Sequence, residues 1–158
     1  MRAGIGYDVH RLVAGRSLVL GGVNIPYEKG LQGHSDADVL VHAVMDALLG
    51  AAGEGDIGKH FPDSDMKYRG ISSLVLLAEV KKLLDEKGFA VLNLDSVIVA
   101  QEPKLAPHTG EMSLNLAETL GISAGQANVK ATTTEGLGFT GAGEGIAAYA
   151  VAMLKSGR

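Results

Sequence analysis

Glycine is the most constraining feature of this sequence, because it occupies 22 of 158 positions, about twice the usual share of about 7%. Aromatic residues make up only 4% of the chain, whereas hydrophobic residues make up 46%. Large rings therefore cannot fill the interior. We expect a core of Val, Leu, Ile and Ala, with tight turns or close backbone contacts at the glycines.

Length and charge narrow the class of protein. We expect a single domain over residues 1–158, because a chain of this size can bury roughly two-thirds of its unfolded surface. A net charge of −4 without a basic block argues against a nucleic-acid partner. No apolar run reaches the ~18 residues of a membrane span, and the sequence starts without a signal-like segment, so we expect a cytoplasmic bacterial protein.

Hydrophobic periodicity predicts a mixture of helices and strands, and so an α+β or α/β fold. Ser35 or Asp36 is expected to cap the first helix. The tail at 146–155 is locally ambiguous, and its Ala, Met and Leu content favours a helix. The expected strands are 2–10, a hairpin within 17–27 turning at Gly21–Gly22, 89–101 and 128–134; the expected helices are 37–49, 71–87 and one following 102–112 that ends at Gly121; the expected loops are 28–38 and 50–65.

The segment "GYDVHRL" places Asp8 and His10 two residues apart in the first predicted strand. Side chains at i and i+2 of a strand point to the same face, so the carboxylate and the imidazole should lie side by side. A packed core disfavours such a pair unless both groups have partners. A metal site would explain it. Because the chain has no cysteine, its metal ligands must be His, Asp or Glu.

His42 is a candidate third ligand, in the predicted helix "DADVLVHAVMDALLG". Two His and one carboxylate with an open position form a recurrent catalytic zinc arrangement. Asp38 and Asp46 lie about one helical turn on either side of His42. They could orient its ring or be solvated helix charges. A lone histidine in a helix is more often a core or surface residue, and spacing alone does not bring the strand and the helix together.

Three glycine-rich segments could bind phosphate, but none matches a nucleotide fingerprint. "GEGDIGKH" ends in His60 where a Walker A loop needs Ser or Thr, "GIGYDV" lacks the third glycine, and "GFTGAGEG" has no strand–helix context. The segment "KATTTEG" is a better candidate for phosphate binding, because Thr hydroxyls and backbone N–H groups suit phosphate oxygens and Glu135 suits Mg²⁺. An ordinary exposed edge strand would explain the same threonines.

Taken together, these motifs resemble the 2-C-methyl-D-erythritol 2,4-cyclodiphosphate synthase family of the non-mevalonate isoprenoid pathway, over the whole chain. The matching segments are "GYDVHRL", "GHSDADVLVHAVMDALLGAAGEGDIGKHFPDSD", "AQEPKLAPH" and "NVKATTTEGLGFTGAGEGI". Such an enzyme is a phosphorus–oxygen lyase. It converts 4-diphosphocytidyl-2-C-methyl-D-erythritol 2-phosphate to the cyclic diphosphate, with release of CMP.

The resemblance implies a ferredoxin-like subunit in a homotrimer. In that fold, helices cover one side of a mixed sheet and the sheets face the threefold axis, with active sites between subunits. It implies a strand for residues 146–155. It also implies zinc held by Asp8, His10 and His42, and Mg²⁺ or Mn²⁺ held by Glu135.

The resemblance also implies the residues that contact substrate, with catalytic roles for His34 and Thr133. His34 and Ser35 would lie on a mobile loop over the phosphates, and the stretches 100–106 and 131–133 would form the cytidine pocket of the adjacent subunit. The implied set is Asp8, Val9, His10, His34, Ser35, Asp56, Ile57, Gly58, Phe61, Pro62, Asp63, Ser64, Asp65, Ala100, Gln101, Glu102, Pro103, Lys104, Leu105, Ala106, Ala131, Thr132, Thr133, Thr134, Glu135, Phe139 and Ala142.

One position departs from the family. Ala142 stands where many members have an Arg that helps to hold an isoprenoid diphosphate in the axial cavity, so this chain is not expected to bind a diphosphate there. Ile5, Tyr7 and Tyr149 are expected to line that cavity. Two other functions use the same groups. One is a zinc-dependent nucleoside-diphosphate phosphohydrolase, and the other is a metal-stabilised trimeric binding protein without turnover.

Overall fold

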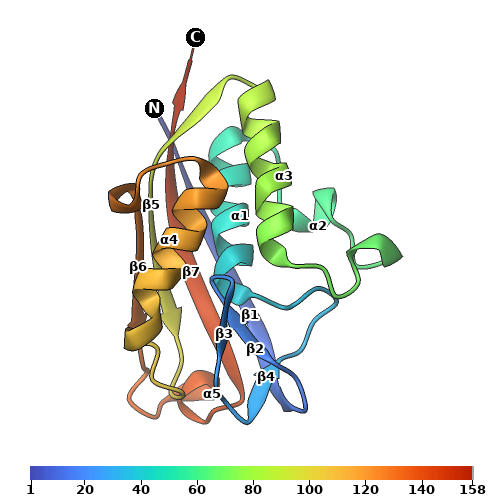
Figure 1. The fold of residues 1–158 in the computed structure, drawn as a ribbon, viewed down its shortest axis with the longest axis vertical. Coiled ribbons are helices and arrows are strands. Elements are labelled where there is room, and N and C mark those ends of the chain that lie inside the picture. Colours follow the sequence, from blue (N-terminus) through green and yellow to red (C-terminus); the bar gives the residue numbers. More distant parts are fainter. Residues whose placement is uncertain (158) are drawn as a thin grey trace.

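The computed structural model describes residues 1–157 and shows a mixed α/β fold (Figure 1). Five strands form one sheet in the order β4-β1-β7-β5-β6, in which β5 and β6 are parallel and the other neighbours antiparallel. The strands are β1 (Arg2–Ala14), β4 (Lys29–Leu31), β5 (Phe89–Val99), β6 (Ala127–Thr132) and β7 (Gly145–Ser156), and a separate hairpin joins β2 (Leu18–Leu20) to β3 (Val23–Ile25).

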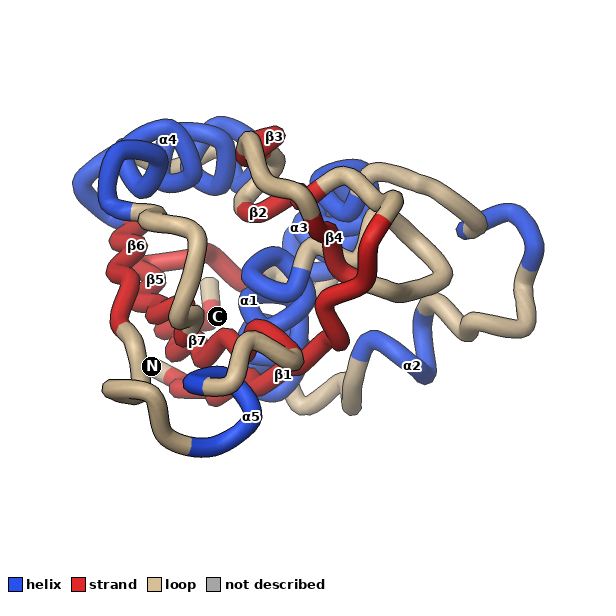
Figure 2. The backbone as a smooth tube through the Cα atoms, turned by 90° about the horizontal axis from the view of Figure 1, so that it is seen from below, coloured by secondary structure: helices blue, strands red, loops and turns tan. Residues whose placement is uncertain are grey.

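Three long helices lie on one face of the sheet, as the end-on view in Figure 2 shows. Among the described residues, no helix combines the length and the apolar character needed to cross a bilayer. The helices are α1 (Val39–Ala52), α3 (Ser73–Glu86) and α4 (Thr109–Leu120), together with the short α2 (Ile57–His60) and α5 (Gly138–Gly141) and 3₁₀ turns at Met66–Tyr68, Ala106–His108 and Ala124–Gln126.

Helix α1 packs closely on β1 because the strand presents glycines to it. A Cβ added to Gly4 would lie 2.0 Å from the Ala47 carbonyl oxygen, and one added to Gly6 would lie 1.8 Å from that of Ala43. On β7, Ala150 pairs with Gly6 and is buried. The expectation of close backbone contacts at glycines is therefore confirmed, and the buried core consists mainly of Leu, Val, Ala and Ile, as expected.

The C-terminal segment is a strand, so the local preference for a helix was wrong. β7 lies between β1 and β5 and forms antiparallel ladders with both. Its alanines suit this position, since Ala148, Ala150 and Ala152 are buried on the face toward the helices. Backbone pairing on both edges outweighs the intrinsic helix preference of alanine.

Most other elements lie where periodicity predicts them, with shifted ends. β1 runs four residues beyond the predicted strand, and the expected loops contain β4 and α2. The predicted N-cap of α1 was wrong: the cap is Asp38, whose carboxylate accepts a hydrogen bond from the Val41 N–H. The turn at Gly21–Gly22 is confirmed, with both residues at positive φ.

Candidate metal centre and active site

Strand β1 presents Asp8 and His10 on the face that carries α1. Asp8 Oδ2 lies 2.9 Å from His10 Nε2, so the side-by-side placement predicted from strand periodicity is confirmed. The His10 ring is also anchored from behind, because its Nδ1 lies 2.8 Å from the Gln32 carbonyl oxygen. A carbonyl oxygen only accepts hydrogen bonds, so His10 carries a proton on Nδ1. The Nε2 of the neutral ring is therefore available to a metal ion, and the Nε2–H of the charged ring donates to Asp8.

His42 reaches the same point from α1. Its Nδ1 lies 3.0 Å from Asp8 Oδ2 and 3.2 Å from His10 Nε2, and only 8% of the residue is exposed. Ligands of a tetrahedral zinc ion lie about 2.0–2.2 Å from the metal and therefore about 3.3–3.6 Å from one another. The three side chains thus fit a single metal ion after a small outward adjustment.

The charge distribution also favours a cation at this point. Burial opposes the charged form of Asp8, but the adjacent His10 and His42 side chains outweigh it and lower the pKa of Asp8 to about 2. Burial likewise opposes the charged form of His10, and its hydrogen bond with Asp8 outweighs this and raises the pKa of His10. A carboxylate and two imidazoles at this spacing are stabilised when a positive charge lies between them.

Asp38 and Asp46 do not hydrogen-bond to the His42 ring, and neither is simply a solvated helix charge. Asp38 is fully buried and accepts from the N–H groups of Gly21, Gly22 and Val41. Burial raises the pKa of Asp38 to about 6. It therefore joins the β2–β3 hairpin to the start of α1. Asp46 accepts from the Ile57 N–H at 2.8 Å and so fixes the start of α2.

The cluster of Asp8, His10 and His42 lines a pocket of about 500 Å³, here called the metal pocket. The segment with His34 and Ser35 forms one wall, and Arg16 holds it by donating to the carbonyl oxygens of Gly33 and Ser35 at 3.1 Å each. His34 Nε2 is 3.0 Å from the Asp65 carbonyl oxygen. The predicted residues that line this pocket are Asp8, His10, His34, Ser35, His42, Ile57, Gly58, Phe61, Pro62 and Asp63.

Comparisons with known proteins show which family this chain belongs to. The sequence matches the YgbB family over residues 1–155. The chain belongs to the YgbB family. A relative in Pelotomaculum thermopropionicum, named 2-C-methyl-D-erythritol 2,4-cyclodiphosphate synthase, is 68% identical over 154 residues, which is 98% of this chain and 95% of that protein.

Solved structures with the same fold support the YgbB assignment. The bifunctional IspDF from Campylobacter jejuni is 46% identical with a TM-score of 0.94, and the match covers 98% of this chain but only 42% of that longer one. A 2C-methyl-D-erythritol-2,4-cyclodiphosphate synthase solved with CDP is 39% identical with a TM-score of 0.89, over 98% of this chain and all of that one.

A second hollow in this YgbB-family chain brings together most of the predicted cytidine-binding residues. It has a volume of about 140 Å³ and shares no lining residue with the metal pocket. Gln101 Oε1 accepts a hydrogen bond from the Gly136 N–H at 3.1 Å, which joins the segment after β5 to the segment after β6. Its lining residues are Ala100, Gln101, Pro103, Lys104, Leu105, Ala106, Ala131, Thr132 and Thr133.

The remaining predicted residues lie outside both hollows. Glu135 follows β6 in a left-handed conformation with φ of 54°, and its N–H donates to Thr133 Oγ1. Val9 and Phe139 line a third hollow of about 240 Å³. Asp56 caps α2, and Asp65 caps the turn at Met66–Tyr68. The Thr134 hydroxyl forms a hydrogen bond with Thr140 Oγ1. The other predicted residues are exposed: Ser64, Glu102 and Ala142.

Sequence reasoning missed several residues of the metal pocket. Met45, Tyr68 and Leu76 line it, and their types and spacing look like ordinary core positions. Gly33 lines it as well. Sequence reasoning also missed Ser73, the first residue of α3, whose Oγ lies 3.0 Å from His42 Nε2. No local signal connects Ser73 with a histidine 31 residues away.

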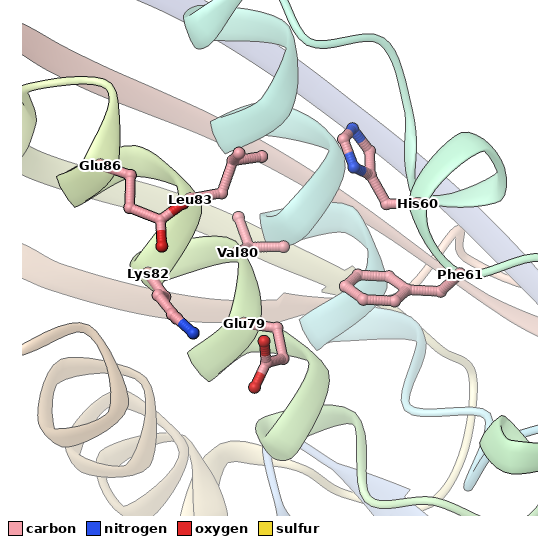
Figure 3. A pocket seen from close by; sticks show the side chains of 7 residues that line it. All are labelled: His60, Phe61, Glu79, Val80, Lys82, Leu83 and Glu86. Carbon is pink, nitrogen blue, oxygen red and sulfur yellow. The ribbon is translucent and has the colours of Figure 1, made fainter.

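Another hollow, of about 240 Å³, lies between α3 and the C-terminal end of α2 (Figure 3). Glu79, Lys82 and Glu86 project from α3, while His60 and Phe61 come from the opposite side. The His60 ring does not join the carboxylates of α3, because its Nε2 donates to the Glu54 carbonyl oxygen at 2.8 Å. The polar groups here do not converge on a common point, and we assign no function to this hollow.

Proposed function

We propose that this chain is a 2-C-methyl-D-erythritol 2,4-cyclodiphosphate synthase, a phosphorus–oxygen lyase of isoprenoid biosynthesis. The observation that carries this proposal is the convergence of Asp8, His10 and His42 at the base of a pocket that His34 and Ser35 also line, in a YgbB-family chain. Its substrate is 4-diphosphocytidyl-2-C-methyl-D-erythritol 2-phosphate. The proposed unit is one synthase domain over residues 1–158 in the bacterial cytoplasm, and the bacterial source of the relative at 68% identity supports this location.

In the proposed reaction, an oxygen of the substrate's 2-phosphate attacks the β-phosphorus. One P–O bond forms, the bond from the β-phosphorus to the bridging oxygen breaks, and CMP leaves with that oxygen. The attacking oxygen is already anionic, so no general base is needed. Catalysis then depends on positioning and charge neutralisation, and an intramolecular attack gains strongly from preset geometry.

Asp8, His10 and His42 hold zinc in this proposal, and Glu135 holds Mg²⁺ or Mn²⁺. When bound, such cations polarise phosphoryl oxygens and neutralise developing negative charge. His34 and Ser35 contact the phosphates from the wall of the pocket. Thr133 offers its hydroxyl to a phosphate, and Asp56, Ile57 and Gly58 contact the ribose and methylerythritol portion. The segments 100–106 and 131–133 hold the cytidine, with the rest of the predicted set around them.

We further propose that the ferredoxin-like subunit forms a homotrimer with active sites between adjacent subunits. The sheet face away from the helices exposes apolar side chains of β1 and β7, including Ile5 (73% exposed) and Val151 (48%), which pair across the two strands. On the same face, the Tyr7 and Tyr149 rings lie 4.9 Å apart. Within one chain, the metal pocket and the hollow with the predicted cytidine-binding residues share no lining residue, which favours an active site built from two subunits. Light scattering at three chain masses would support the trimer, and a monomer would refute it.

A ³¹P NMR time course with the purified protein, the cytidine-bearing substrate, Zn²⁺ and Mg²⁺ tests the function. We expect coupled cyclic-diphosphate resonances to grow together with CMP. Release of orthophosphate or of a linear product would instead identify a zinc-dependent phosphohydrolase. Stoichiometric zinc without any turnover would identify a metal-stabilised binding protein.

Glu135→Gln should raise the Mg²⁺ concentration needed for half-maximal rate by about tenfold or more. The substitution keeps the shape of the side chain but removes its charge, and Mg²⁺ sites in proteins contain only one or two carboxylates. Zinc content should stay unchanged. The control is Glu118→Gln, on an exposed position of α4. A Mg²⁺ titration identical to that of the parent protein would contradict the assignment of Glu135.

A further inference from the structure

The side of the His42 ring away from the metal cluster meets two hydroxyl groups. Its Nε2 lies 3.0 Å from Ser73 Oγ and 3.2 Å from Ser35 Oγ. Both serines are buried; Ser73 is fully inaccessible. A hydroxyl can donate one hydrogen bond and accept others, so this contact alone does not fix which ring nitrogen of His42 carries the proton. The partners of each hydroxyl decide that question.

Asp36 determines where the Ser73 proton points. Ser73 Oγ donates to Asp36 Oδ1, and the Ser73 backbone N–H donates to Asp36 Oδ2 at 3.1 Å. Asp36 Oδ1 also accepts the Asp38 N–H at 3.1 Å. All three groups that meet the Asp36 carboxylate are therefore donors, as an ionised carboxylate requires. The hydroxyl proton of Ser73 is thus used, and only its lone pairs face His42.

Ser35 does not decide the question in the same way. Its Oγ accepts the Ala37 N–H at 3.2 Å. Within residues 1–157, the His42 ring is the one hydrogen-bond partner that could accept the Ser35 proton. Ser35 can therefore donate to a bare Nε2 or accept from a protonated one. Ser73 can only accept. A bare Nε2 would place its lone pair against those of Ser73 Oγ at 3.0 Å, which is repulsive.

We propose that Ser73, held by Asp36, is a positioning residue that keeps the proton of His42 on Nε2 and so presents Nδ1 to the metal. This inference rests on the proposed zinc-dependent function. His10 is fixed in the opposite sense by a backbone carbonyl, which leaves its Nε2 free. The two rings thus direct different nitrogens to one point, and the nitrogen that His42 presents is set by Ser73 on α3 together with Asp36 from the loop before α1. Partners of this kind orient metal ligands and raise their basicity.

Ser73→Ala tests the proposal because it removes only the hydroxyl. The backbone N–H of residue 73 can still donate to Asp36, so the start of α3 is retained. We expect the affinity for Zn²⁺, measured by competition with a chromophoric chelator, to fall about 10–100-fold. The matched control is Ser96→Ala, which also deletes one buried hydroxyl, donated to the Asn128 carbonyl oxygen far along the sheet. Its zinc affinity should equal that of the parent protein.

A double-mutant cycle separates this role from a merely structural one. Asp36→Ala frees the Ser73 proton, which can then donate to His42 Nε2 and drive the ring proton to Nδ1. The double variant Asp36→Ala/Ser73→Ala should bind Zn²⁺ no more weakly than the weaker single variant, because both changes act through one hydroxyl. Strictly additive losses in affinity would overturn the proposal.

The position of the proton is also observable without zinc and without substrate. At alkaline pH, ¹⁵N chemical shifts of the His42 ring should show Nε2 protonated in the parent protein and both forms mixed in Ser73→Ala. A parent protein with the proton on Nδ1, or a Ser73→Ala variant with unchanged zinc affinity, would overturn the proposal. Neither the ¹⁵N shifts nor the zinc affinity depends on catalysis. Failure of this proposal is therefore distinguishable from failure of the proposed function, which would show as absence of the cyclic product in the ³¹P assay.

Discussion

His42→Ala is expected to abolish stable zinc binding and to lower the rate of product formation by about a thousandfold or more. The substitution removes one of three converging ligand atoms and leaves Asp8 and His10 as an incomplete set. A cation that neutralises transition-state charge is worth several kcal/mol, and about 4 kcal/mol corresponds to a thousandfold change in rate. Elemental analysis of the dialysed protein and the ³¹P assay measure the two effects.

The subunit assembly should survive this substitution. His42 projects toward the pocket rather than the apolar sheet face that we propose as the interface, so light scattering should give the same mass as for the parent protein. His108→Ala is a matched control, since His108 lies in a 3₁₀ turn before α4 and should retain zinc. A His42→Ala protein that remains fully loaded with zinc would refute the assignment of His42 as a ligand.

Gly6→Ala is expected to destabilise the fold by at least about 3 kcal/mol. A Cβ at this position would lie 1.8 Å from the Ala43 carbonyl oxygen and 2.8 Å from the Ala47 nitrogen. Overpacking costs about 1–3 kcal/mol when side chains can shift, but here the obstacle is the backbone of α1. The helix must move away from β1, and His42 would move with it. Urea denaturation followed by circular dichroism measures the loss, and recovery of the protein only in the insoluble fraction would show a greater one.

Gly110→Ala is the control for this prediction. Gly110 lies in the first turn of α4, and an added Cβ would meet no atom within 4 Å. Its stability should be unchanged or slightly higher, because alanine favours a helix over glycine by up to about 1 kcal/mol. If Gly6→Ala unfolds at the same urea concentration as the parent protein, the close contact between β1 and α1 is not a feature of the fold.

The sequence alone determined the local arrangement of the first two candidate ligands. Strand periodicity places Asp8 and His10 on one face, and the structure confirms this with a separation of 2.9 Å. The glycine content and the scarcity of rings likewise indicated close backbone contacts before any fold was known. These properties follow from the covalent geometry of a strand and from side-chain size, which do not depend on the rest of the chain.

Long-range packing decided what local reasoning could not. Periodicity left open whether His42 meets β1, and Gly4 and Gly6 allow that meeting by admitting the backbone of α1. The tail became a strand because β1 and β5 pair with both of its edges. Asp38 is buried because its carboxylate accepts hydrogen bonds from three N–H groups, two of them in the β2–β3 hairpin.

The resemblance of the motifs to a known family suggested the ligand set, but it gave no account of how the rings are oriented. That depends on Ser73 and the Gln32 carbonyl, which are distant in sequence from the histidines they contact, and on Asp36, which holds the Ser73 hydroxyl. A hydrogen bond between residues 22 or 31 positions apart leaves no trace in local spacing. Residue types and their periodicity therefore determined which groups are available, and tertiary packing decided which of them meet and in which protonation form.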